Sequence, residues 1–268
     1  MMQATLSASR RATYITVAAL CMVATFPGRT HGLGFITESV LQDLSIDRTL
    51  YSYYNLVATL AGALFCIPIG AWLDRIGCRK TLSIVLALLG VSVLAMSAVQ
   101  SKALFFVCLL LTRGFGQSAL SVASITLISK YFPKSKLGPA MGIYSVLTSA
   151  FFVGAFGGMG AALEHLQPCT LMWRSDEIIV PVWRMAWGGI GVILLAFFVP
   201  LVLLCVRRRH VLPVAEAEQA RPLEEAGVSF AQAIRTPVFW IFGLSIAFYG
   251  MVSSGIALHN EDILLERG

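Results

Sequence analysis

The stretch "GAWLDRIGCRK", Gly70 to Lys80, lies between two apolar blocks and indicates a tight turn that joins two helices. Gly70 lets a helix end approach a neighbouring helix closely. Asp74 can accept hydrogen bonds from a neighbouring helix N-terminus, where the helix dipole favours an anion. Gly77 permits the turn itself, and Arg79 and Lys80 favour a cytoplasmic position for the loop. A lone D-R-x-G would indicate no more than a positively charged turn.

The composition around this stretch identifies the chain as a polytopic membrane protein. Of its 268 residues 57% are hydrophobic and only 13% are charged, whereas a soluble domain has about 25% charged residues. The apolar residues also come in blocks of about 20, which is the length of a helix that crosses a bilayer. The lipid bilayer is therefore an expected partner. The net charge of +6 comes from short basic clusters between the blocks, which excludes a continuous basic face for nucleic acid.

The apolar blocks predict seven membrane spans. Their expected positions are residues 12–41, 50–73, 81–99, 103–130, 138–163, 183–206 and 237–259. The segment 164–182 between the fifth and sixth spans is expected to be irregular, because it contains two prolines and an acidic pair.

Basic residues predict the orientation of the spans. Most of the 20 Lys and Arg residues lie in residues 10–11, 75–80, 130–136 and 207–235, which all fall on one side of the membrane. The opposite side carries Arg48, Lys102, Arg174, Arg184 and Arg267. The positive-inside rule then predicts a multi-pass protein of the plasma (inner) membrane with a cytoplasmic N-terminus.

Three regions follow from the same pattern. Residues 1–206 form an N-terminal bundle of six transmembrane helices, and residues 207–236 form a polar, charged cytoplasmic linker. Residues 237–268 contain the seventh transmembrane helix and a truncated remainder.

The full pattern G-x-x-x-D-R-x-G-x-R-K after the second span resembles the signature loop of the major facilitator superfamily of secondary transporters. The resemblance implies an all-α polytopic fold, with an N-terminal six-helix bundle of two inverted three-helix repeats and the start of a second bundle. It also implies a symporter or antiporter that works by alternating access, rocking one bundle against the other. Asp74 and Arg75 would act in a cytoplasmic gate, to which Gly70, Gly77, Arg79 and Lys80 contribute the rest of the motif.

A second stretch, residues 109–143, is similar to the fourth and fifth spans of superfamily branches that carry organic anions, including monocarboxylate and oxalate/formate carriers. The R-G-x-G-Q of Arg113 to Gln117 and the sequence "YFPKSKLGPAMG" carry this likeness. A drug exporter would be expected to show G-P-x-x-G-G in the fifth span, where this chain has "GAFGGMG".

The chain ends shortly after the seventh span, whereas a complete carrier has about twelve. Two alternatives therefore stay open beside an organic-anion carrier. One is a non-transporting or degenerate relative, either a sensor or a remnant, and the other is a carrier of a neutral solute or a drug.

Arg113 is expected deep in the membrane, about ten residues from the outer end of the fourth span and thus roughly 15 Å deep. A charge there costs at least ~2.5–3.5 kcal/mol, so it needs a partner or a wet cavity. It is either an anion-binding or coupling residue, or a structural arginine bonded to backbone carbonyls of the first span. Gln117 follows one turn later on the same face and could assist either role.

The stretch "FPGRTHG", residues 26–32, interrupts the first span. If the span ended before Phe26 it would be too short to cross, so the break is expected inside the membrane. Interrupted helices often form the substrate site of carriers. Arg29 and His31 are therefore expected to face inward near the depth of Arg113 and to bind a small anionic substrate. In the alternative, they line an outer vestibule and contact only water. A coupling proton could use Glu38, at the outer end of the same span.

We find no nucleotide-binding loop, metal-ligand spacing or catalytic triad in the sequence. The expectation is a transporter rather than an enzyme, with no catalytic residues, no metal and no cofactor.

Overall fold

The structure is a computed structural model that describes residues 8–173, 176–207 and 230–258. The chain divides into two compact units, Met1–Arg209 and His210–Gly268. Most of the predicted linker, and Arg174 and Arg267 from the orientation argument, lie outside the described residues.

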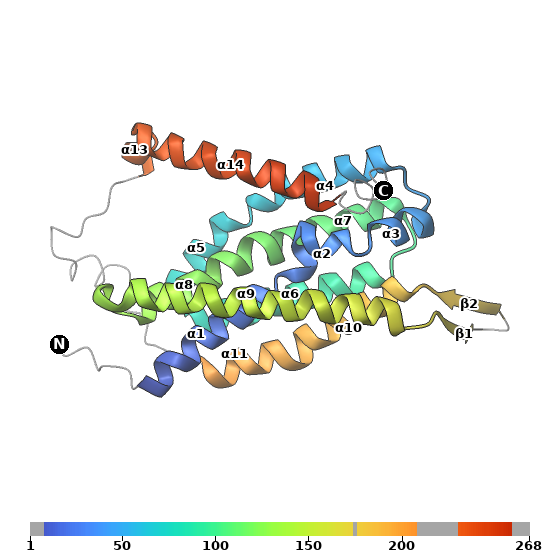
Figure 1. Ribbon diagram of the computed structural model, residues 1–268, viewed down its shortest axis with the longest axis horizontal. Helices are drawn as coiled ribbons and strands as arrows, with labels where there is room; N and C mark the ends of the chain where they lie inside the picture. The colour runs from blue at the N-terminus through green and yellow to red at the C-terminus, as the bar shows by residue number, and fades with distance from the viewer. Residues whose placement is uncertain (1–7, 174–175, 208–229, 259–268) are drawn as a thin grey trace. The chain divides into compact units, whose positions relative to one another are not determined.

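Helices account for almost all of the first unit (Figure 1). The first predicted span consists of α1 (Ala8–Val23), the 3₁₀ turn η1 (Phe26–Gly28), α2 (Thr30–Gly34) and α3 (Thr37–Leu44). The second and third spans are α4 (Arg48–Ala63) with α5 (Cys66–Arg75), and α6 (Gly77–Ser97). The fourth is α7 (Lys102–Thr112), the π-helix η2 (Arg113–Leu120) and α8 (Ser121–Tyr131). The fifth is α9 (Lys134–His165), and the sixth is α10 (Val182–Ile193), the π-helix η3 (Leu194–Phe198) and α11 (Val199–Cys205).

Six described helices are long and apolar enough to cross a membrane. They are Arg48–Arg75, Gly77–Ser97, Lys102–Tyr131, Ser135–His165, Val182–Cys205 and Pro237–Ile256, which match the second to seventh predicted spans. The first predicted span is not among them because its helix is interrupted, so that its longest continuous piece, α1, has 16 residues.

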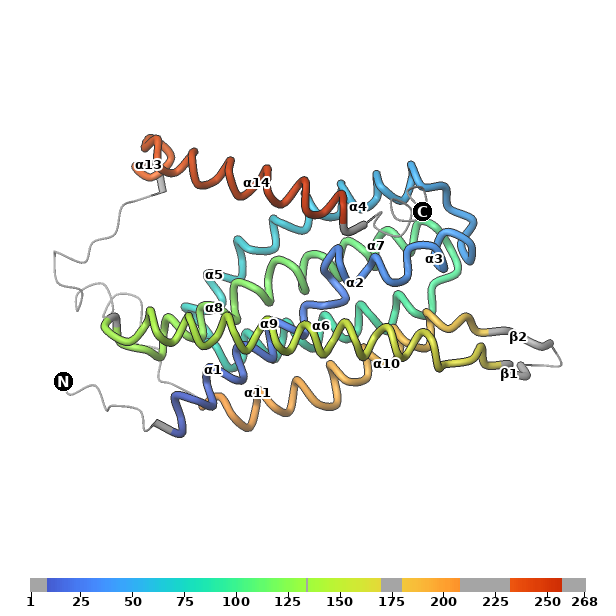
Figure 2. Tube along the Cα trace, viewed as in Figure 1, coloured from blue at the N-terminus to red at the C-terminus, as the bar shows by residue number. Residues whose placement is uncertain are grey.

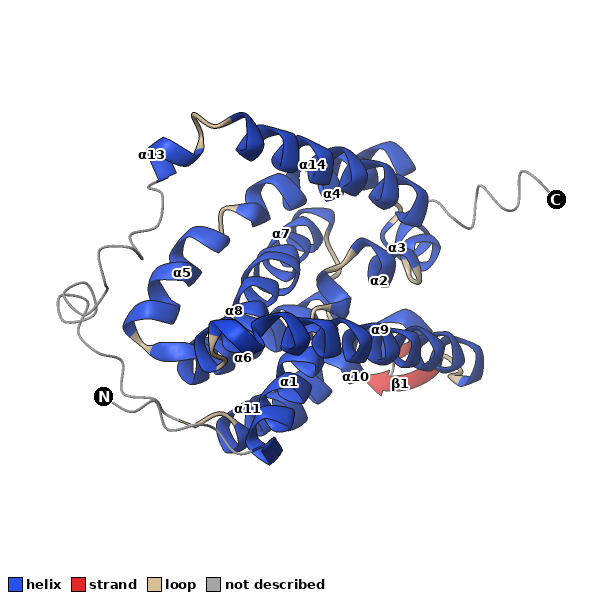
Figure 3. Cartoon of the chain, turned by 60° about the vertical axis from the view of Figure 1, so that its left-hand side comes forward, coloured by secondary structure: helices blue, strands red, loops and turns tan. Residues whose placement is uncertain are grey.

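The core of the first unit lies around α6. This helix packs against α7, α10 and α11, while α1 packs against α8 and α9 (Figures 1 and 3). The largest buried apolar side chains of the unit include Leu82, Leu86, Leu89, Met96, Phe105, Leu109, Trp183 and Trp187. Burial of such side chains from several spans makes the bundle a single packed body.

Polar and aromatic contacts tie the ends of the spans together. At one end Asp43, beyond the break in the first span, accepts hydrogen bonds from Nε of Arg184 at 2.7 Å and from the indole of Trp183 at 3.0 Å. At the other end the rings of Tyr14 and Tyr131 lie 4.5 Å apart. The contacts at both ends agree with the predicted alternation of the spans.

The segment 164–182 differs from the irregular connection predicted above. It forms an antiparallel hairpin of β1 (Cys169–Trp173) and β2 (Asp176–Val180), in which Cys169 pairs with Val180. The prediction weighed the flanking prolines and missed the β-branched and aromatic residues between them, which favour extended strands. The hairpin adds a small sheet to an otherwise helical unit.

The second unit contains the short helix α13 (Phe230–Ala233) and α14 (Pro237–Leu258), which is the seventh predicted span. The indole of Trp240 donates a hydrogen bond of 2.8 Å to the carbonyl of Ile234, which joins the start of α14 to the preceding turn.

Candidate functional site: the break in the first span

The predicted interruption of the first helix is confirmed at η1. Pro27, near the start of this turn, has no backbone N–H to donate. The backbone N–H of Gly28 donates to the carbonyl of Thr25 at 2.9 Å. Arg29 then adopts an extended conformation with φ −94° and ψ 151° before α2 begins at Thr30. Figure 2 follows the trace through this change of direction. Arg29 and Thr30 therefore lie at the point where the regular helix is interrupted.

The break lies directly on the π-helix of the fourth span. A Cβ atom placed on Gly116 would lie 3.2 Å from Cα of Gly28, and one placed on Gly28 would lie 2.5 Å from the carbonyl oxygen of Thr112. Gly28 therefore has no room for a side chain against this backbone, and a Cβ at Gly116 would be crowded against Gly28, because the two backbones touch. The second glycine of R-G-x-G-Q thus has a physical role, which is to bring the fourth span against the break in the first. A π-helix at this contact is typical of functional sites.

Arg113 is held in this contact by neutral oxygen atoms. Its Nη1 donates to Thr30 at 2.9 Å and to Gln117 at 2.7 Å, and its Nη2 donates to Asn55 at 2.6 Å. Its side chain is buried, with 2% of the residue exposed. Nε is buried and has no hydrogen-bond partner within the described part of the chain. The acceptors are side chains of three spans, rather than the backbone carbonyls of the first span that the structural alternative named.

Arg29 lies half-buried on the other side of the contact. Its Nε donates to Thr25 at 2.7 Å, and its Nη2 contacts the sulfur of Met22 at 3.0 Å and the hydroxyl of Ser121 at 3.4 Å. Its guanidinium also lies over the ring of Phe152, 5.3 Å from the ring centre. None of these groups is an acid.

His31 is exposed, and its ring meets Phe156 edge-on at 6.3 Å between centres. Of the four predicted binding residues, the structure joins Arg113 to Gln117 directly. Arg29 contacts the same fourth span at Ser121, and His31 stands apart from the Arg113 network with an aromatic neighbour.

No carboxylate among the described residues balances the charge of the site. Ion pairs in the described part of the chain join Glu38 to Arg48, Asp74 to Lys130 and Asp43 to Arg184. These pairs lie near the ends of the spans, and none of the described carboxylates bonds to Arg29 or Arg113. Because a guanidinium in a protein stays protonated, the site carries positive charge with only neutral acceptors around it.

The motif turn has a partner other than the one expected. Asp74 accepts a hydrogen bond of 2.6 Å from Nζ of Lys130 at the end of α8, rather than from a helix N-terminus. Lys130 also donates to the carbonyl of Leu73 at 2.8 Å. Gly77 has φ 81°, a conformation that favours glycine, as the tight turn requires.

Gly70 does not have the close neighbour expected from the sequence. A Cβ placed there meets nothing within 4 Å among the described residues. In the same motif, Arg75 and Lys80 are exposed and Arg79 is half-buried. The cationic residues of the turn therefore stay at the surface of this unit.

Comparison with known proteins identifies the family. The sequence profile of the Major Facilitator Superfamily matches residues 15–262, which is most of the chain. The chain belongs to this superfamily. The profile includes both the interrupted first span and the motif turn, which agrees with the resemblance found in the sequence; the organic-anion branches stay a prediction.

Solved structures support the superfamily fold. A bacterial homologue of the human lysosomal transporter Spinster, in an inward-facing and unoccupied conformation, matches with a TM-score of 0.67 and 20% identity, over 97% of this chain and 56% of that one. The same homologue in its inward-facing and occupied conformation matches with a TM-score of 0.62 and 18% identity, over 97% and 55% of the two chains. The chain thus spans about half the length of these superfamily structures. No curated protein matches its sequence significantly.

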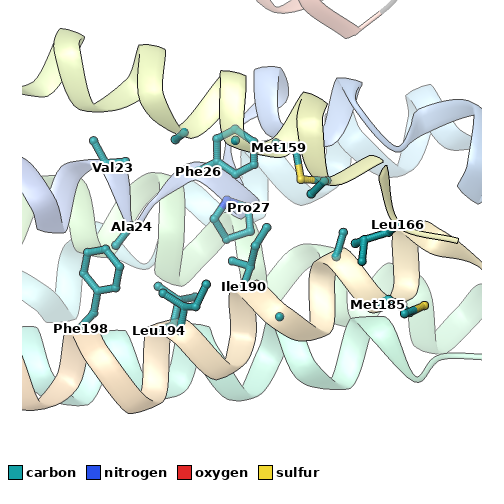
Figure 4. A pocket seen from close by; sticks show the side chains of 16 residues that line it. Val23, Ala24, Phe26, Pro27, Met159, Leu166, Met185, Ile190, Leu194 and Phe198 are labelled. Atoms are coloured by element: carbon teal, nitrogen blue, oxygen red, sulfur yellow. The ribbon is translucent and has the colours of Figure 1, made fainter. Parts of the chain in front are cut away.

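An apolar cavity of about 610 Å³ lies on another side of the break. Figure 4 shows Phe26 and Pro27 from η1 at its wall, with Met159 of α9 and Ile190 of α10. Neither Arg29, His31 nor Arg113 lines it. A cavity with no cationic lining does not suit a small anion, so in this superfamily member the candidate anion site is the cationic side of the break.

The sequence interpretation missed two polar residues of this site, Thr30 and Ser121. Ser121 could have been found, because Arg113, Gln117 and Ser121 follow one another at intervals of four and so share a helix face. Asn55 on the second span is the third acceptor of Arg113. Its contact with Arg113 joins residues 58 apart in sequence, which helical spacing does not predict.

Proposed function

We propose that this protein is a secondary active transporter of small organic anions that works by alternating access, with the anion bound at the break in the first span. The observation that carries the proposal is the pair Arg29 and Arg113. Both guanidiniums lie at this break and are bonded by neutral groups, without a carboxylate partner among the described residues.

Electrostatics supports an anion as the missing partner. Each positive charge at membrane depth costs at least ~2.5–3.5 kcal/mol, and neutral oxygens offset this only in part. A bound carboxylate would neutralise one of these charges with charge-assisted hydrogen bonds, which are about twice as strong as neutral ones. The site therefore favours a monovalent or divalent anion over a neutral solute or a cation.

The two arginines would have different roles. The hydrogen bonds of Arg29 use Nε and Nη2, so its Nη1 atom has no partner among the described residues and is available to a carboxylate. His31, exposed on the adjoining turn, would contribute a second donor. Arg113 already donates to Thr30, Asn55 and Gln117. It would therefore attract the anion through its charge, and Gln117 would help to hold the Arg113 side chain in place.

The superfamily and the charge pattern support the remaining features of the proposal. The protein would act in the plasma (inner) membrane with its N-terminus in the cytoplasm, as the positive-inside rule favours. It would work as a symporter or antiporter, with a proton as a coupling ion. Asp74 and Arg75 would act in the cytoplasmic gate, together with Gly70, Gly77, Arg79 and Lys80.

Equilibrium binding to the purified 268-residue chain in lipid nanodiscs tests the anion site. Radiolabelled acetate and benzoate are compared with neutral glucose, using the wild type, Arg29→Gln and Arg29→Lys. We expect carboxylate binding to weaken by about 30-fold or more in Arg29→Gln, because one partner of a desolvated charge pair is removed. Arg29→Lys should retain part of the affinity, because the charge stays.

Arg48→Gln is the matched control, since Arg48 lies at a span end with its side chain 53% exposed and is not part of the site. Its carboxylate affinity should equal that of the wild type. Unchanged carboxylate binding in Arg29→Gln, or a wild type that binds glucose in preference to both carboxylates, would contradict the proposal.

A further inference from the structure

The cationic side of the break faces a run of aromatic rings from α9. The rings of Phe152 and Phe156 stack with their centres 5.7 Å apart and their planes at 28°. Phe156 also stacks on Phe35 of the first span, at 6.1 Å and 23°. These three half-buried rings, Phe35, Phe156 and Phe152, form a nearly parallel series that we call the aromatic wall.

Arg29 and His31, the two accessible donors of the candidate site, both border this wall. The guanidinium of Arg29 lies 5.3 Å from the centre of Phe152, and the ring of His31 meets Phe156 edge-on at 6.3 Å. A carboxylate that bonds to Arg29 would therefore bond to a guanidinium that already lies against the ring of Phe152. Whatever group adjoins that carboxylate in the ligand meets an aromatic surface.

The positions of Arg29 and the aromatic wall limit how far a ligand's apolar group can lie from its carboxylate. A ring attached directly to the carboxylate, or one carbon away, could lie against Phe152 and Phe156 while the carboxylate stays on Arg29. A long alkyl chain on the ligand would have most of its apolar surface beyond the aromatic wall, without contact to it. A second carboxylate next to the first would be placed against apolar rings, where it loses its hydration without gaining hydrogen bonds.

We propose that Phe152 and Phe156 make the site selective for carboxylates that carry a planar aromatic ring on, or one carbon from, the carboxylate group. This inference rests on the proposed function, because Arg29 holds the anion in both. An aromatic ligand ring extends the existing series of rings in the offset or edge-on arrangements that aromatic pairs prefer. A saturated ring of the same size gains the apolar contact but not the additional stabilisation of an aromatic pair.

The test compares four probes on the full chain in nanodiscs: benzoate, phenylacetate, cyclohexanecarboxylate and acetate. The wild type should bind benzoate or phenylacetate about two- to tenfold more tightly than cyclohexanecarboxylate, as one aromatic pair contributes. Phe152→Leu and Phe156→Leu keep apolar volume and remove the ring, so each should reduce this preference towards one. Phe152→Trp retains an aromatic face and should preserve it.

Phe197→Leu is the matched control. Phe197 is 52% exposed on η3, and its ring contacts Phe198 rather than the wall, so its loss should leave the preference unchanged. Acetate affinity in each variant reports on the anion site itself and shows whether the variant is folded. The Trp variant further separates loss of the ring from loss of the fold.

The outcomes separate the two proposals. If Arg29→Gln abolishes binding of all four probes while Phe152→Leu and Phe156→Leu keep the wild-type preference, the aromatic wall is overturned and the anion site stands. A wild type without preference for the aromatic probes also overturns the wall. If benzoate binds Arg29→Gln as tightly as it binds the wild type, the proposed function fails, and with it this inference.

Discussion

Nη2 of Arg113 donates to Oδ1 of Asn55 across 2.6 Å, so that an amide on the second span holds a guanidinium on the fourth. Both side chains are buried, and Asn55 in turn donates to the carbonyl of Tyr51 at 3.0 Å within its own helix. The contact fixes the orientation of Arg113 between two spans that are separated in sequence by the whole third span.

Removing this acceptor should destabilise the bundle. In Asn55→Ala a buried, charged donor loses its partner, and we expect the free energy of unfolding to fall by about 1.5–3 kcal/mol. Denaturant unfolding in detergent, followed by circular dichroism, measures the change. Thr59→Ala, which removes a hydroxyl bonded only to the carbonyl of Asn55 one turn away, is the control and should cost less. A smaller loss for Asn55→Ala than for Thr59→Ala would contradict this role for Asn55.

Replacing the same amide by an acid tests the charge of the site. Asn55→Asp would supply Arg113 with an internal carboxylate at hydrogen-bond distance, so that one positive charge is neutralised by the protein itself. We expect the contact between Arg113 and residue 55 to be preserved. The affinity for carboxylates should fall about tenfold or more, because the internal ion pair now competes with the ligand. Binding of labelled acetate in nanodiscs measures this. Equal or higher acetate affinity in Asn55→Asp would count against an anion site near Arg113.

The backbone contact of Gly28 with Gly116 should tolerate no side chain. Gly28→Ala places a methyl group 2.5 Å from the carbonyl oxygen of Thr112, so the first and fourth spans must separate. We expect a loss of about 1–3 kcal/mol in the free energy of unfolding, as for other overpacked contacts.

Gly158→Ala is a control for Gly28→Ala on a helix of the same unit. A Cβ at Gly158 meets no atom of the described residues within 4 Å, so this change should be neutral or slightly stabilising. Parallel thermal-denaturation curves of the two variants make the comparison. If both variants unfold at the wild-type temperature, the close contact at Gly28 is not required.

Asp43 should be more important for stability than Glu38, although each carboxylate is paired with an arginine. Asp43 accepts from Trp183 and Arg184, and the side chain of Arg184 is only 13% exposed, whereas Arg48 opposite Glu38 is 53% exposed. We expect Asp43→Ala to cost about 1–3 kcal/mol, because two donors lose their acceptor.

Glu38→Ala should cost less than about 1 kcal/mol, as exposed ion pairs do. Urea unfolding of both variants in the same detergent measures the two losses in the free energy of unfolding, which are then compared. A larger effect for Glu38→Ala would show that the pairing at Asp43 contributes little to joining the outer part of the first span to the sixth.

The pair of Asp74 and Lys130 allows gating to be separated from stability. The side chain of Asp74 is 67% exposed, so Asp74→Asn should change the free energy of unfolding by less than about 1 kcal/mol. If the motif acts in a gate, the same variant should still reduce uptake of a labelled carboxylate by proteoliposomes severalfold. Loss of stability and of uptake in proportion would indicate a structural role instead.

Sequence patterns predicted the parts of this structure that depend on local order. The lengths of the second to seventh spans follow from apolar blocks, and the break at Pro27 follows from a first block too short to cross. The pairing of Arg113 with Gln117 follows from a spacing of four residues on one helix face. In each case the information lies within one or two helical turns.

Contacts between distant segments were not predictable in the same way. Asp43 meets Arg184 across 141 positions, and no periodicity indicates that the two ends of these spans adjoin. The π-helix at Arg113–Leu120 also escaped prediction; it contains Gly116, which packs against Gly28 of the distant first span. The stack of Phe152 and Phe156 on Phe35 likewise depends on how α9 packs beside the break.

The unbalanced charge of Arg29 and Arg113 has a practical consequence for every measurement on this protein. If the proposed anion site holds, a pair of arginines with no acid bonded to them among the described residues would attract whichever anion the buffer supplies, and chloride or sulfate would then compete with the substrate. Apparent affinities should therefore weaken as the chloride concentration rises, even at constant ionic strength. Titrations in gluconate would give the tighter constants, and affinities from different buffers become comparable only after this competition is included.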